Sequence, residues 1–318
     1  MSEKAWEYAG KKLLEILLTL LCVTFLSFLL MRLSPIDPAT AYVTRNTAHV
    51  TQEQIEKTKV EMGLNKPLVV QYGAWLKNAI QLDFGVSLKT GYPVIEELGK
   101  AVPVTVSVVL LAAALMLVGI VLFGALAYLL RNQVLGYVLT FLCIAGISIP
   151  PFYTATLLLD IFAVRWNVFT VTGNGGLLRF LPAAICLAVF GVSLYSQLFA
   201  KGLEREMNED YAFYARCRGF SELRILLRHA FPRVAATLLP SLMQALGLFL
   251  AGITVIEQVF SLPGIGGLII HGVIQRDSPV IHAVVLFLAF ALVFLDVVSD
   301  LIQRILMRNQ AAKEVRIL

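Results

Sequence analysis

Charged side chains are scarce in this sequence. Asp, Glu, Lys and Arg make up 15% of its 318 residues, whereas hydrophobic residues make up 58%. Soluble domains carry about 25% charged residues, so this composition excludes an ordinary soluble fold. The few charges gather between long apolar runs, and the mean hydropathy is +0.79. These features predict a polytopic membrane protein. The pI of about 9.0 does not indicate nucleic-acid binding, because the basic residues lie at the edges of apolar runs.

Cysteine is also rare, with four residues spread over the chain: Cys22, Cys143, Cys186 and Cys217. Three fall in apolar runs and one in a basic segment, and no pair has the C-x-x-C spacing. Disulfide frameworks and zinc sites depend on clustered cysteines. The sequence therefore predicts neither.

Motifs of the common nucleotide-binding and catalytic sites are missing. The chain has no G-x-x-x-x-G-K-[ST], so it is not expected to bind ATP phosphates itself. It has no H-E-x-x-H or G-x-S-x-G either, so no catalytic residue is assigned, and a membrane-embedded enzyme is only a distant alternative. An ATP-independent carrier, the other alternative, would favour internal repeats, which this sequence lacks.

The histidines at His49, His271 and His282 are scattered. A metal-binding cluster of His271 and His282 with Glu257 and Asp277 is conceivable, but these residues do not have the spacing of a known metal motif. We therefore predict no metal site.

Six apolar runs are long enough to cross a bilayer. The first, 13–31, follows an N-terminal segment, 1–12, that contains Lys4, Lys11 and Lys12. It lacks a small-x-small cleavage site, so we expect an uncleaved span. The other expected spans lie in a core of 102–306, and a tail of 307–318 follows; these spans are 102–130, 135–162, 180–200, 234–256 and 283–306.

The region 32–101 between the first two spans is expected to be a helical insert. Thr51 and Gln54 form a capping-box start, and Gly63 is a helix stop. After Pro67, a second helix is expected to carry one apolar face, formed by Tyr72, Trp75, Leu76, Ala79 and Ile80. The insert either only packs on the spans or also offers a surface to a partner.

Prolines and glycines interrupt two further apolar stretches. Pro150 and Pro151 break the third span, either for packing or beside a water-lined path. The segment 257–282 contains several glycines and prolines and cannot be one straight helix, so we expect a re-entrant external segment. It begins with Glu257, whose charge is costly at membrane depth, so this side chain has either a structural hydrogen bond or a functional role.

The segment 201–233, called the basic loop below, is the longest charged interruption in the second half of the chain. Its pattern predicts a helix, a turn at Gly219 and a second helix capped by Ser221. It also carries more apolar side chains than a simple connection needs. It is therefore either an amphipathic loop on the membrane surface or a docking loop for a partner protein.

Basic residues are distributed unevenly between the two sides that six spans define. The basic loop and both termini share one side, and the short loops on the other side keep only Arg165, Arg179 and Arg276. Since short inner segments are enriched in Lys and Arg, both termini are expected to be cytoplasmic. The glycine-rich outer loop 165–179 (Gly173, Asn174, Gly175 and Gly176) is expected to form turns and not to bind phosphate.

Several strings resemble the peptide/nickel branch of the permeases of binding-protein-dependent ABC importers, specifically the first-permease type. In the basic loop, DYAFYARCRG and LRHA resemble the EAA loop of these permeases, with Ala215 and Gly219 at matching positions and Phe231-Pro232 in place of Leu-Pro. Further matching strings, in the same order, are VTFLSFLLMRLSPIDPA (23–39), GLNKPLVVQYGAWL (63–76), SIPPF (148–152), VIEQVFSLPGIG (255–266) and QRDSPVI (275–281). The resemblance covers about 13–307. The departures are Asp296, where asparagine is usual, and Met307-Arg308-Asn309 in place of Asp-Pro-Arg.

The resemblance implies an all-α type I ABC importer permease fold, with six transmembrane helices and the external insert, in a bacterial cytoplasmic (inner) membrane. The implied partners are a second homologous permease, two cytoplasmic ABC ATPase subunits that bind ATP and Mg, an external solute-binding protein and membrane lipid. This chain would then hold no cofactor and would not itself be an enzyme.

The resemblance also implies roles for individual residues. Those expected to couple to the ATPases are Asp210, Tyr211, Tyr214, Ala215, Arg218, Gly219, Ser221 and His229. Those expected at the translocation pathway or external gate are Pro150, Pro151, Glu257, Pro263, Gly264, Gly266, Arg276, Asp277 and Asp300.

The mechanism that the resemblance implies is alternating access, in which closure of the ATPases biases one of two packings of the spans. The expected cargo is nickel, as a chelate, or short peptides. The strings AHVTQEQIEKTKVEMGLNKPL and NEDYAFYARCRG look more like the nickel and metal-chelate members, so they favour nickel.

Overall fold

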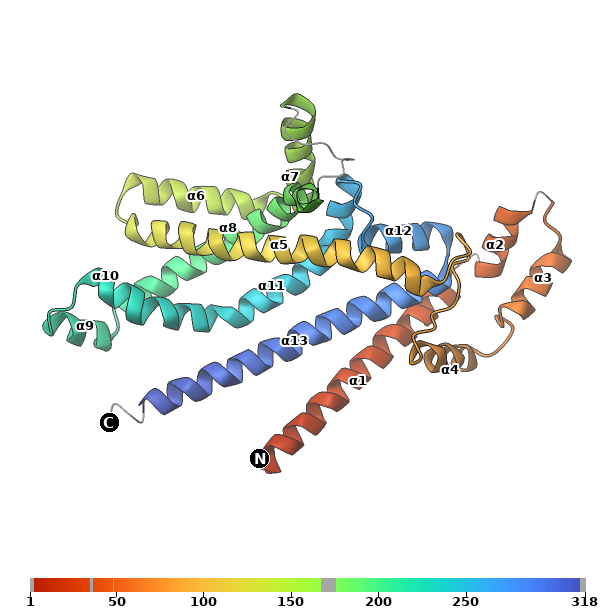
Figure 1. Cartoon of the computed structure of the whole chain (residues 1–318), viewed down its shortest axis with the longest axis horizontal. Coiled ribbons are helices and arrows are strands. Elements are labelled where there is room, and N and C mark those ends of the chain that lie inside the picture. Colours follow the sequence, from red (N-terminus) through yellow and green to blue (C-terminus); the bar gives the residue numbers. More distant parts are fainter. Residues whose placement is uncertain (1–2, 35–36, 48, 167–175, 315–318) are drawn as a thin grey trace. The chain divides into compact units, whose positions relative to one another are not determined.

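The computed structural model describes residues 3–34, 37–47, 49–166 and 176–314, and Figure 1 shows that they are helical nearly throughout. Among these described residues there is no strand, only an isolated bridge between Val86 and Pro93. The chain divides into two compact units. Unit 1 comprises Met1–Thr105 and Pro263–Val293, and unit 2 comprises Val106–Leu262 and Phe294–Leu318.

Unit 1 contains the first long helix and the insert that follows it. Its helices are α1 (Glu3–Arg32), α2 (Pro38–Asn46), α3 (Gln52–Glu61), α4 (Leu68–Ala79) and α12 (Ile265–Gln275), with the first residues of α5 (Val94–Leu129) and of α13 (Ser278–Glu314). The predicted helical insert is confirmed, and so are its helix boundaries. Thr51 and Gln54 form both hydrogen bonds of a capping box, Gly63 has the left-handed φ of +67° after α3, and α4 follows Pro67.

One detail of the predicted α4 face is wrong. Tyr72, Trp75 and Leu76 are at least half-buried and Ala79 is buried, but Ile80 is 77% exposed. Ile80 lies just beyond the end of the helix, where the described residues of unit 1 do not cover it.

The core of unit 1 joins the start of α5 to α12 and α13. Its buried residues are Val94, Leu98, Ala101, Ile265, Val280, Ala283 and Val284. The Thr105 hydroxyl accepts a hydrogen bond from the Ile265 backbone N–H at 2.9 Å. This N–H lies in the first turn of α12, where backbone donors have no partner within the helix. The segment before the last long helix is therefore fixed to the helix that follows the insert.

Unit 2 is built around α8 (Leu181–Met207), the helix with the most buried residues of the unit. It packs on α6 (Val134–Ser148), α7 (Pro151–Leu158) and α11 (Phe231–Val259). Glycine residues also let α8 approach α5 closely. A Cβ at Gly124 of α5 would lie 2.9 Å from the Ser196 carbonyl oxygen, and one at Gly191 would lie 2.4 Å from Met116 Sδ. Small residues of this kind let membrane helices approach closely.

Among the described residues, five helices are long and apolar enough to cross a membrane. The number of candidate spans rises to six if a pair of helices joined at a sharp bend is counted as one span. The five are Gly10–Arg32, Val94–Leu129, Leu181–Met207, Glu222–Val259 and Ser278–Ile305. This agrees with an all-α polytopic membrane protein.

The bent pair is α6 and the helix from Pro151 to Arg165, which ends in the π-helical turn η1 (Leu159–Arg165). The expected break at Pro150 and Pro151 is present, but the bend is 102°, much larger than a kink. Ile149 and Pro150 both have extended ψ angles, 123° and 137°, because a residue before proline is driven out of the helical region. The predicted turns at Gly173, Asn174 and Gly175 lie outside the described residues, and the short helix η2 (Gly176–Phe180) follows.

Helix ends differ from several expected span ends. The helix α5 begins at Val94, ahead of the expected 102, and α8 continues to Met207. The helix into the fifth span begins at Glu222 with α10 (Glu222–Ile225) and continues through the π-helical turn η3 (Leu226–Ala230) into α11. The wide turn precedes Pro232, whose ring cannot be placed in an ordinary helical turn without a clash.

Candidate functional site

The basic loop of unit 2 folds as the sequence predicts, as two helices joined at a glycine. The first is α9 (Asp210–Cys217) and the second begins with α10. Gly219 has a φ of +77°, and the Phe220 N–H reaches the Ala215 carbonyl at 3.1 Å, a bond that closes a helix end through a left-handed residue. Ser221 occupies the N-cap position of α10, but its side chain makes no capping hydrogen bond, so that detail of the prediction is wrong.

The base of the basic loop is held by a group of polar and charged side chains. The Tyr211 hydroxyl donates to Glu206 Oε2 at 3.0 Å, and Arg233 Nη1 lies 3.7 Å from the same oxygen. The Arg233 guanidinium also lies over the Tyr211 ring, 4.3 Å from its centroid. Burial and the hydrogen bond to Glu206 raise the pKa of the Tyr211 hydroxyl above its ordinary value. The end of α8, the start of α9 and the start of α11 are thereby joined.

A second group spans the Gly219 turn. Arg216 donates from Nε and Nη2 to the two carboxylate oxygens of Glu222, at 2.6 and 3.1 Å. Its Nη2 also donates to the Met207 carbonyl at 2.9 Å. The hydrogen bond to Glu222 raises the pKa of the Arg216 guanidinium. Sequence reasoning missed this pair, for which the only signal was opposite charges on either side of a glycine turn.

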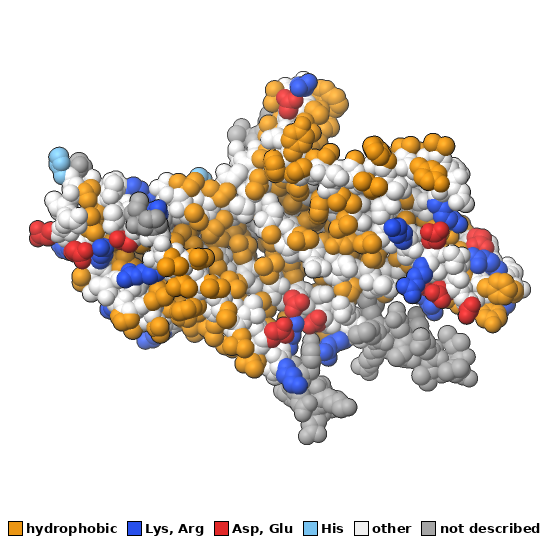
Figure 2. Space-filling model, turned by 180° about the vertical axis from the view of Figure 1, so that it is seen from behind, with side chains coloured by type: hydrophobic (Ala, Val, Ile, Leu, Met, Phe, Trp, Pro, Cys, Tyr) orange, Lys and Arg blue, Asp and Glu red, His pale blue; other side chains and the backbone are white. Residues whose placement is uncertain are grey.

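The outer surface of the basic loop presents large apolar side chains. Tyr214 is 66% exposed and Phe213 is 61% exposed, while the neighbouring Ala212 is fully buried. Leu223 and Leu227 on the second helix are exposed to a similar degree. Figure 2 shows charged side chains gathered around this end of unit 2, beside the hydrophobic ones. Of the other predicted residues, Asp210, Arg218, Gly219, Ser221 and His229 are exposed and Ala215 is half-buried.

The predicted external-gate residues Arg276 and Asp277 lie in unit 1, where they fasten the insert. Arg276 has a left-handed φ of +53° and donates a hydrogen bond to the Ser34 hydroxyl. Asp277 is only 2% exposed, and its Oδ2 accepts from the Ser87 hydroxyl at 2.6 Å and from the Lys89 N–H at 3.1 Å. The junction between α12 and α13 is therefore tied to the last turn of the insert.

The expected interruption of 257–282 is confirmed. The helix α11 ends at Val259, Ser261 has a φ of +50°, and Gly264 is the N-cap of α12. Pro263, Gly264 and Gly266 accompany Arg276 and Asp277 in unit 1.

The remaining candidates for the pathway belong to unit 2. These are Pro150 and Pro151 at the bend, Glu257 near the end of α11, and Asp300 in α13. Glu257 is fully buried, and Asp300 is half-buried.

The histidines considered for a metal cluster have other contacts or stand apart. His282 Nδ1 lies 2.8 Å from the Ser27 hydroxyl, and its ring stacks on Phe28 with centroids 3.7 Å apart. His271 is exposed, and Asp277 is bonded to Ser87 as described. In the described ranges of the chain, no group of three or more His, Cys, Asp or Glu residues could hold a metal ion.

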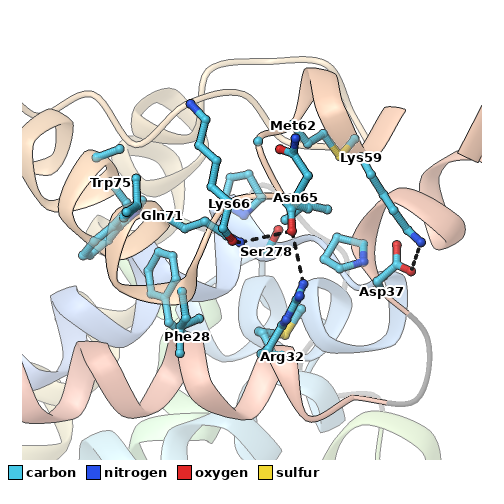
Figure 3. Close-up of a pocket in the computed structure, with 18 of the residues that line it drawn as sticks. Phe28, Arg32, Asp37, Lys59, Met62, Asn65, Lys66, Gln71, Trp75 and Ser278 are labelled. Atoms are coloured by element: carbon cyan, nitrogen blue, oxygen red, sulfur yellow. Dashed lines mark hydrogen bonds and ion pairs between the residues drawn. The ribbon is translucent and has the colours of Figure 1, made fainter. Parts of the chain in front are cut away.

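Unit 1 also contains a pocket of about 780 Å³ that sequence reasoning did not find. Figure 3 shows Phe28 and Arg32 of α1 on one side, with Gln71 and Trp75 of α4 beside them. Arg32 Nη1 and Gln71 Nε2 both donate to the Leu64 carbonyl, at 3.3 and 3.2 Å. No local sequence motif predicts this pocket, because the residues that line it come from four separate segments of the chain.

Paired charges line the other side of this pocket. Lys59 Nζ lies 3.6 Å from Asp37 and 3.0 Å from Glu56. Burial by itself would raise the pKa of the Asp37 carboxyl, but hydrogen bonds from Thr40 and the charge of Lys59 outweigh it and lower this pKa below its ordinary value. Asp37 therefore remains charged as the N-cap of α2.

Comparison with known proteins identifies relatives over nearly the full length. The family described as "Binding-protein-dependent transport system inner membrane component" matches residues 119–311, and the N-terminal component of the same transport systems matches residues 7–109. The chain is 34% identical over 304 residues to a "Putative peptide transport system permease protein" of Brucella suis biovar 1 (strain 1330), covering 93% of this chain and 96% of the relative. It is 26% identical over 288 residues to a metal-staphylopine import system permease protein of Staphylococcus aureus (strain NCTC 8325 / PS 47), covering 90% and 92%.

Proposed function

This chain belongs to the family of binding-protein-dependent transport system inner membrane components, and on that premise we propose that it forms half of the translocation pathway of an ATP-driven importer of short peptides. It is an integral membrane protein with several apolar spans. The other half of the pathway would come from a second, homologous permease. An external solute-binding protein would deliver the cargo, and two cytoplasmic ATPase subunits, binding ATP and Mg, would drive the cycle.

The observation that carries the coupling role is the construction of the basic loop. Its base is joined to α8 and α11 by Glu206, Tyr211 and Arg233, whereas Phe213 and Tyr214 are exposed at its surface. A loop that packed only against its own residues would be expected to bury these aromatic side chains, because burying a large apolar side chain is favourable by about 1.5–3 kcal/mol. Their exposure suits docking to a cytoplasmic ATPase, and the fixed base would carry its movement to the spans.

Docking can be tested on the purified complex with the Phe213→Ser/Tyr214→Ser double variant. We expect it to insert in the membrane normally but to lose co-purification of the ATPases and ATP-dependent uptake. Tyr92→Ser is the matched control, because Tyr92 is a comparably exposed aromatic residue of the insert. Normal ATPase association in the double variant would refute the docking role.

Short peptides are the first candidate cargo, because the relatives named for peptide transport share 34% identity with this chain. A metal chelate is the second candidate, supported by the 26% identical relative named for metal-staphylopine import and by the strings that favour nickel. A chelate needs only a wet, weakly binding route, with selection made by the external binding protein. Such a route requires no metal ligands in the permease.

Uptake by cells that express the complete complex separates the two cargoes. A labelled dipeptide should accumulate in an ATP-dependent manner, and unlabelled nickel chelate should not compete with it. Accumulation of labelled nickel chelate without dipeptide uptake would reverse the order of the candidates. The His49→Gln/His271→Gln variant should transport normally in either case, and loss of uptake would contradict a route without metal ligands.

We also propose that both termini and the basic loop are cytoplasmic and that the membrane is the inner membrane of a bacterium. The uneven distribution of basic residues supports this orientation. In a cysteine-free background, an impermeant thiol reagent should label Glu53→Cys from outside intact cells and should not label Arg224→Cys. Labelling of position 224 from outside would overturn the orientation.

A further inference from the structure

The insert helix α4 is attached to α1 well inside the span. The Tyr72 hydroxyl donates to the Leu21 carbonyl at 3.2 Å and lies 2.9 Å from the Thr24 hydroxyl. The Tyr72 and Phe25 rings have centroids 5.4 Å apart, and those of Trp75 and Phe28 lie 5.3 Å apart. Every one of these contacts is made to a residue that precedes Arg32, the last residue of α1.

The depth of these contacts follows from helix geometry. At about 1.5 Å per residue, Phe28 lies about 6 Å before Arg32 along α1, Thr24 about 12 Å and Leu21 about 16 Å. The candidate span Gly10–Arg32 has 23 residues, so it extends about 34 Å and exceeds the hydrocarbon core of about 30 Å only slightly. The face of α4 that contacts α1 therefore lies below the level at which the span leaves the hydrocarbon.

The face of α1 that α4 covers is continuous with an exposed apolar surface. Phe28, Thr24 and Leu21 are spaced by four and three residues, and the same spacing continues to Leu17 and Leu14. Leu17 and Leu14 are more than half exposed. Within unit 1, α4 thus sits directly above a surface whose composition suits lipid.

The helix α4 has an apolar stripe of its own. Val69, Gly73 and the half-buried Leu76 are spaced by four and three residues, and Ile80, the C-cap residue with helical backbone angles, follows four residues later on the same face. Val69 is 70% exposed, and Ile80 is more exposed still. The pocket of Figure 3 lies on a different side of α4, lined by Val70, Gln71, Ala74, Trp75 and Asn78. The stripe is therefore directed away from the pocket and the helix α3 beyond it.

We propose that α4 is an interfacial helix embedded in the lipid leaflet at the C-terminal end of α1, with its Val69–Leu76–Ile80 stripe against acyl chains. Amphipathic helices of this kind lie about 5–10 Å inside the headgroup boundary, which agrees with the depth of Phe28 and Thr24. The long Lys77 side chain, at the edge of the stripe, extends its ammonium group to the headgroups. The insert is then anchored in the membrane by α4, and its α2 and α3 portion stands in water.

Spin labelling of the complete transporter in phospholipid bilayers tests this placement. Nitroxides are attached in a cysteine-free background to Val69→Cys and Ile80→Cys, with Glu53→Cys of α3 as the aqueous control and Leu17→Cys of α1 as the deep control. At positions 69 and 80 we expect severalfold fewer collisions with water-soluble nickel-EDDA than at 53, together with frequent collisions with oxygen. Nickel-EDDA collisions equal to those at 53 would place α4 in water and overturn the proposal. Few collisions with either reagent would mean that a protein partner covers the stripe, and would overturn it as well.

Native Trp75 provides a second measurement without a label at the stripe. In a variant with Trp6→Phe and Trp166→Phe, bilayers with bromines near the glycerol end of the acyl chains should quench Trp75 fluorescence. Bromines near the chain ends should quench it less. Equal fluorescence in brominated and ordinary lipid would contradict the proposed depth.

Discussion

Two left-handed turns in this protein close helices in opposite ways. The turn after α9 uses Gly219, with a φ of +77°, and a Cβ placed there would meet nothing within 4 Å. The turn after α12 uses Arg276, with a φ of +53°, and leads directly into the buried Asp277. The first turn is shaped by backbone freedom, and the second is held by hydrogen bonds to Ser34, Ser87 and Lys89.

This difference separates a surface for partners from an internal attachment. The Gly219 turn leaves its flanks exposed and projects Phe213 and Tyr214 outward. The Arg276 turn uses its side chains to bind residues that are distant in sequence, and Asp277 and Ser87 are 190 positions apart. Glycine suits the first turn because no contact has to offset backbone strain there. Arginine is tolerated in the second because the surrounding contacts enforce its conformation.

The largest expected effect comes from removing the attachment at the second turn. Asp277→Ala loses two hydrogen bonds to a buried carboxylate and should destabilise unit 1 by roughly 2–4 kcal/mol. We expect a lower melting temperature and faster proteolysis of the 83–93 segment. Asp83→Ala is the control, because the exposed Asp83 side chain accepts a hydrogen bond from the nearby Gly85 N–H and does not reach a distant segment. Equal proteolysis of the two variants would show that Asp277 does not hold the insert.

A smaller effect is expected at the first turn. Gly219→Val forces a side chain into the left-handed region at a cost of about 1–2 kcal/mol, without any steric overlap. The turn should open, and ATPase association should weaken while membrane insertion is retained. Ser221→Ala in the same turn should behave as wild type, because the Ser221 side chain makes no capping bond. Normal transport by Gly219→Val would remove the turn from the coupling role.

The ion pair across the first turn should contribute less. Glu222→Gln weakens the two-point contact with Arg216, and for such an exposed pair the cost is about 0.5–1 kcal/mol. Protection of the α9 amides from hydrogen exchange should fall, with transport reduced but present. High salt should narrow the difference from wild type, and a difference that is independent of salt would argue against an electrostatic role.

The smallest net effect is expected for Arg276→Gly. This variant relieves left-handed strain of about 1 kcal/mol and loses one hydrogen bond to Ser34 of similar value, so stability should change by less than about 1 kcal/mol. The melting temperature measures it. A large loss of stability would show that the arginine holds the turn by more than the Ser34 contact.

Local features of the fold could be predicted from the sequence because they depend on neighbouring residues. The capping box at Thr51, the left-handed Gly219 and the break at Pro150 each follow from chemistry within a few positions. The helical spans follow from apolar runs in the same way. Their ends were less predictable, since α5 and α8 continue past the apolar run into polar turns.

Contacts between distant segments could not be predicted in this manner. Ser27 and His282 are 255 positions apart, and nothing in either local pattern points to the other. The same holds for Asp277 and Ser87, so two residues assigned to an external gate prove to be attached to the insert. The size of the bend at Pro150 was also missed, because a proline indicates a break and not its angle.

The glycine contacts of α8 have a mechanical consequence. At Gly124 the backbone of α5 meets the backbone of α8, because a Cβ there would lie 2.9 Å from the Ser196 carbonyl oxygen, with the Phe199 side chain packed beside it. Side chains can change rotamer and absorb a displacement, whereas backbone atoms in contact can only resist it. At Gly202 the close neighbour is the Val234 side chain of α11, a β-branched residue with few rotamers, and this contact joins α8 to α11 at the edge of the basic loop. A displacement of the basic loop should therefore be transmitted along α8 to the helices packed on it. A methyl group added at Gly202 would overlap with Val234 and separate α8 from α11.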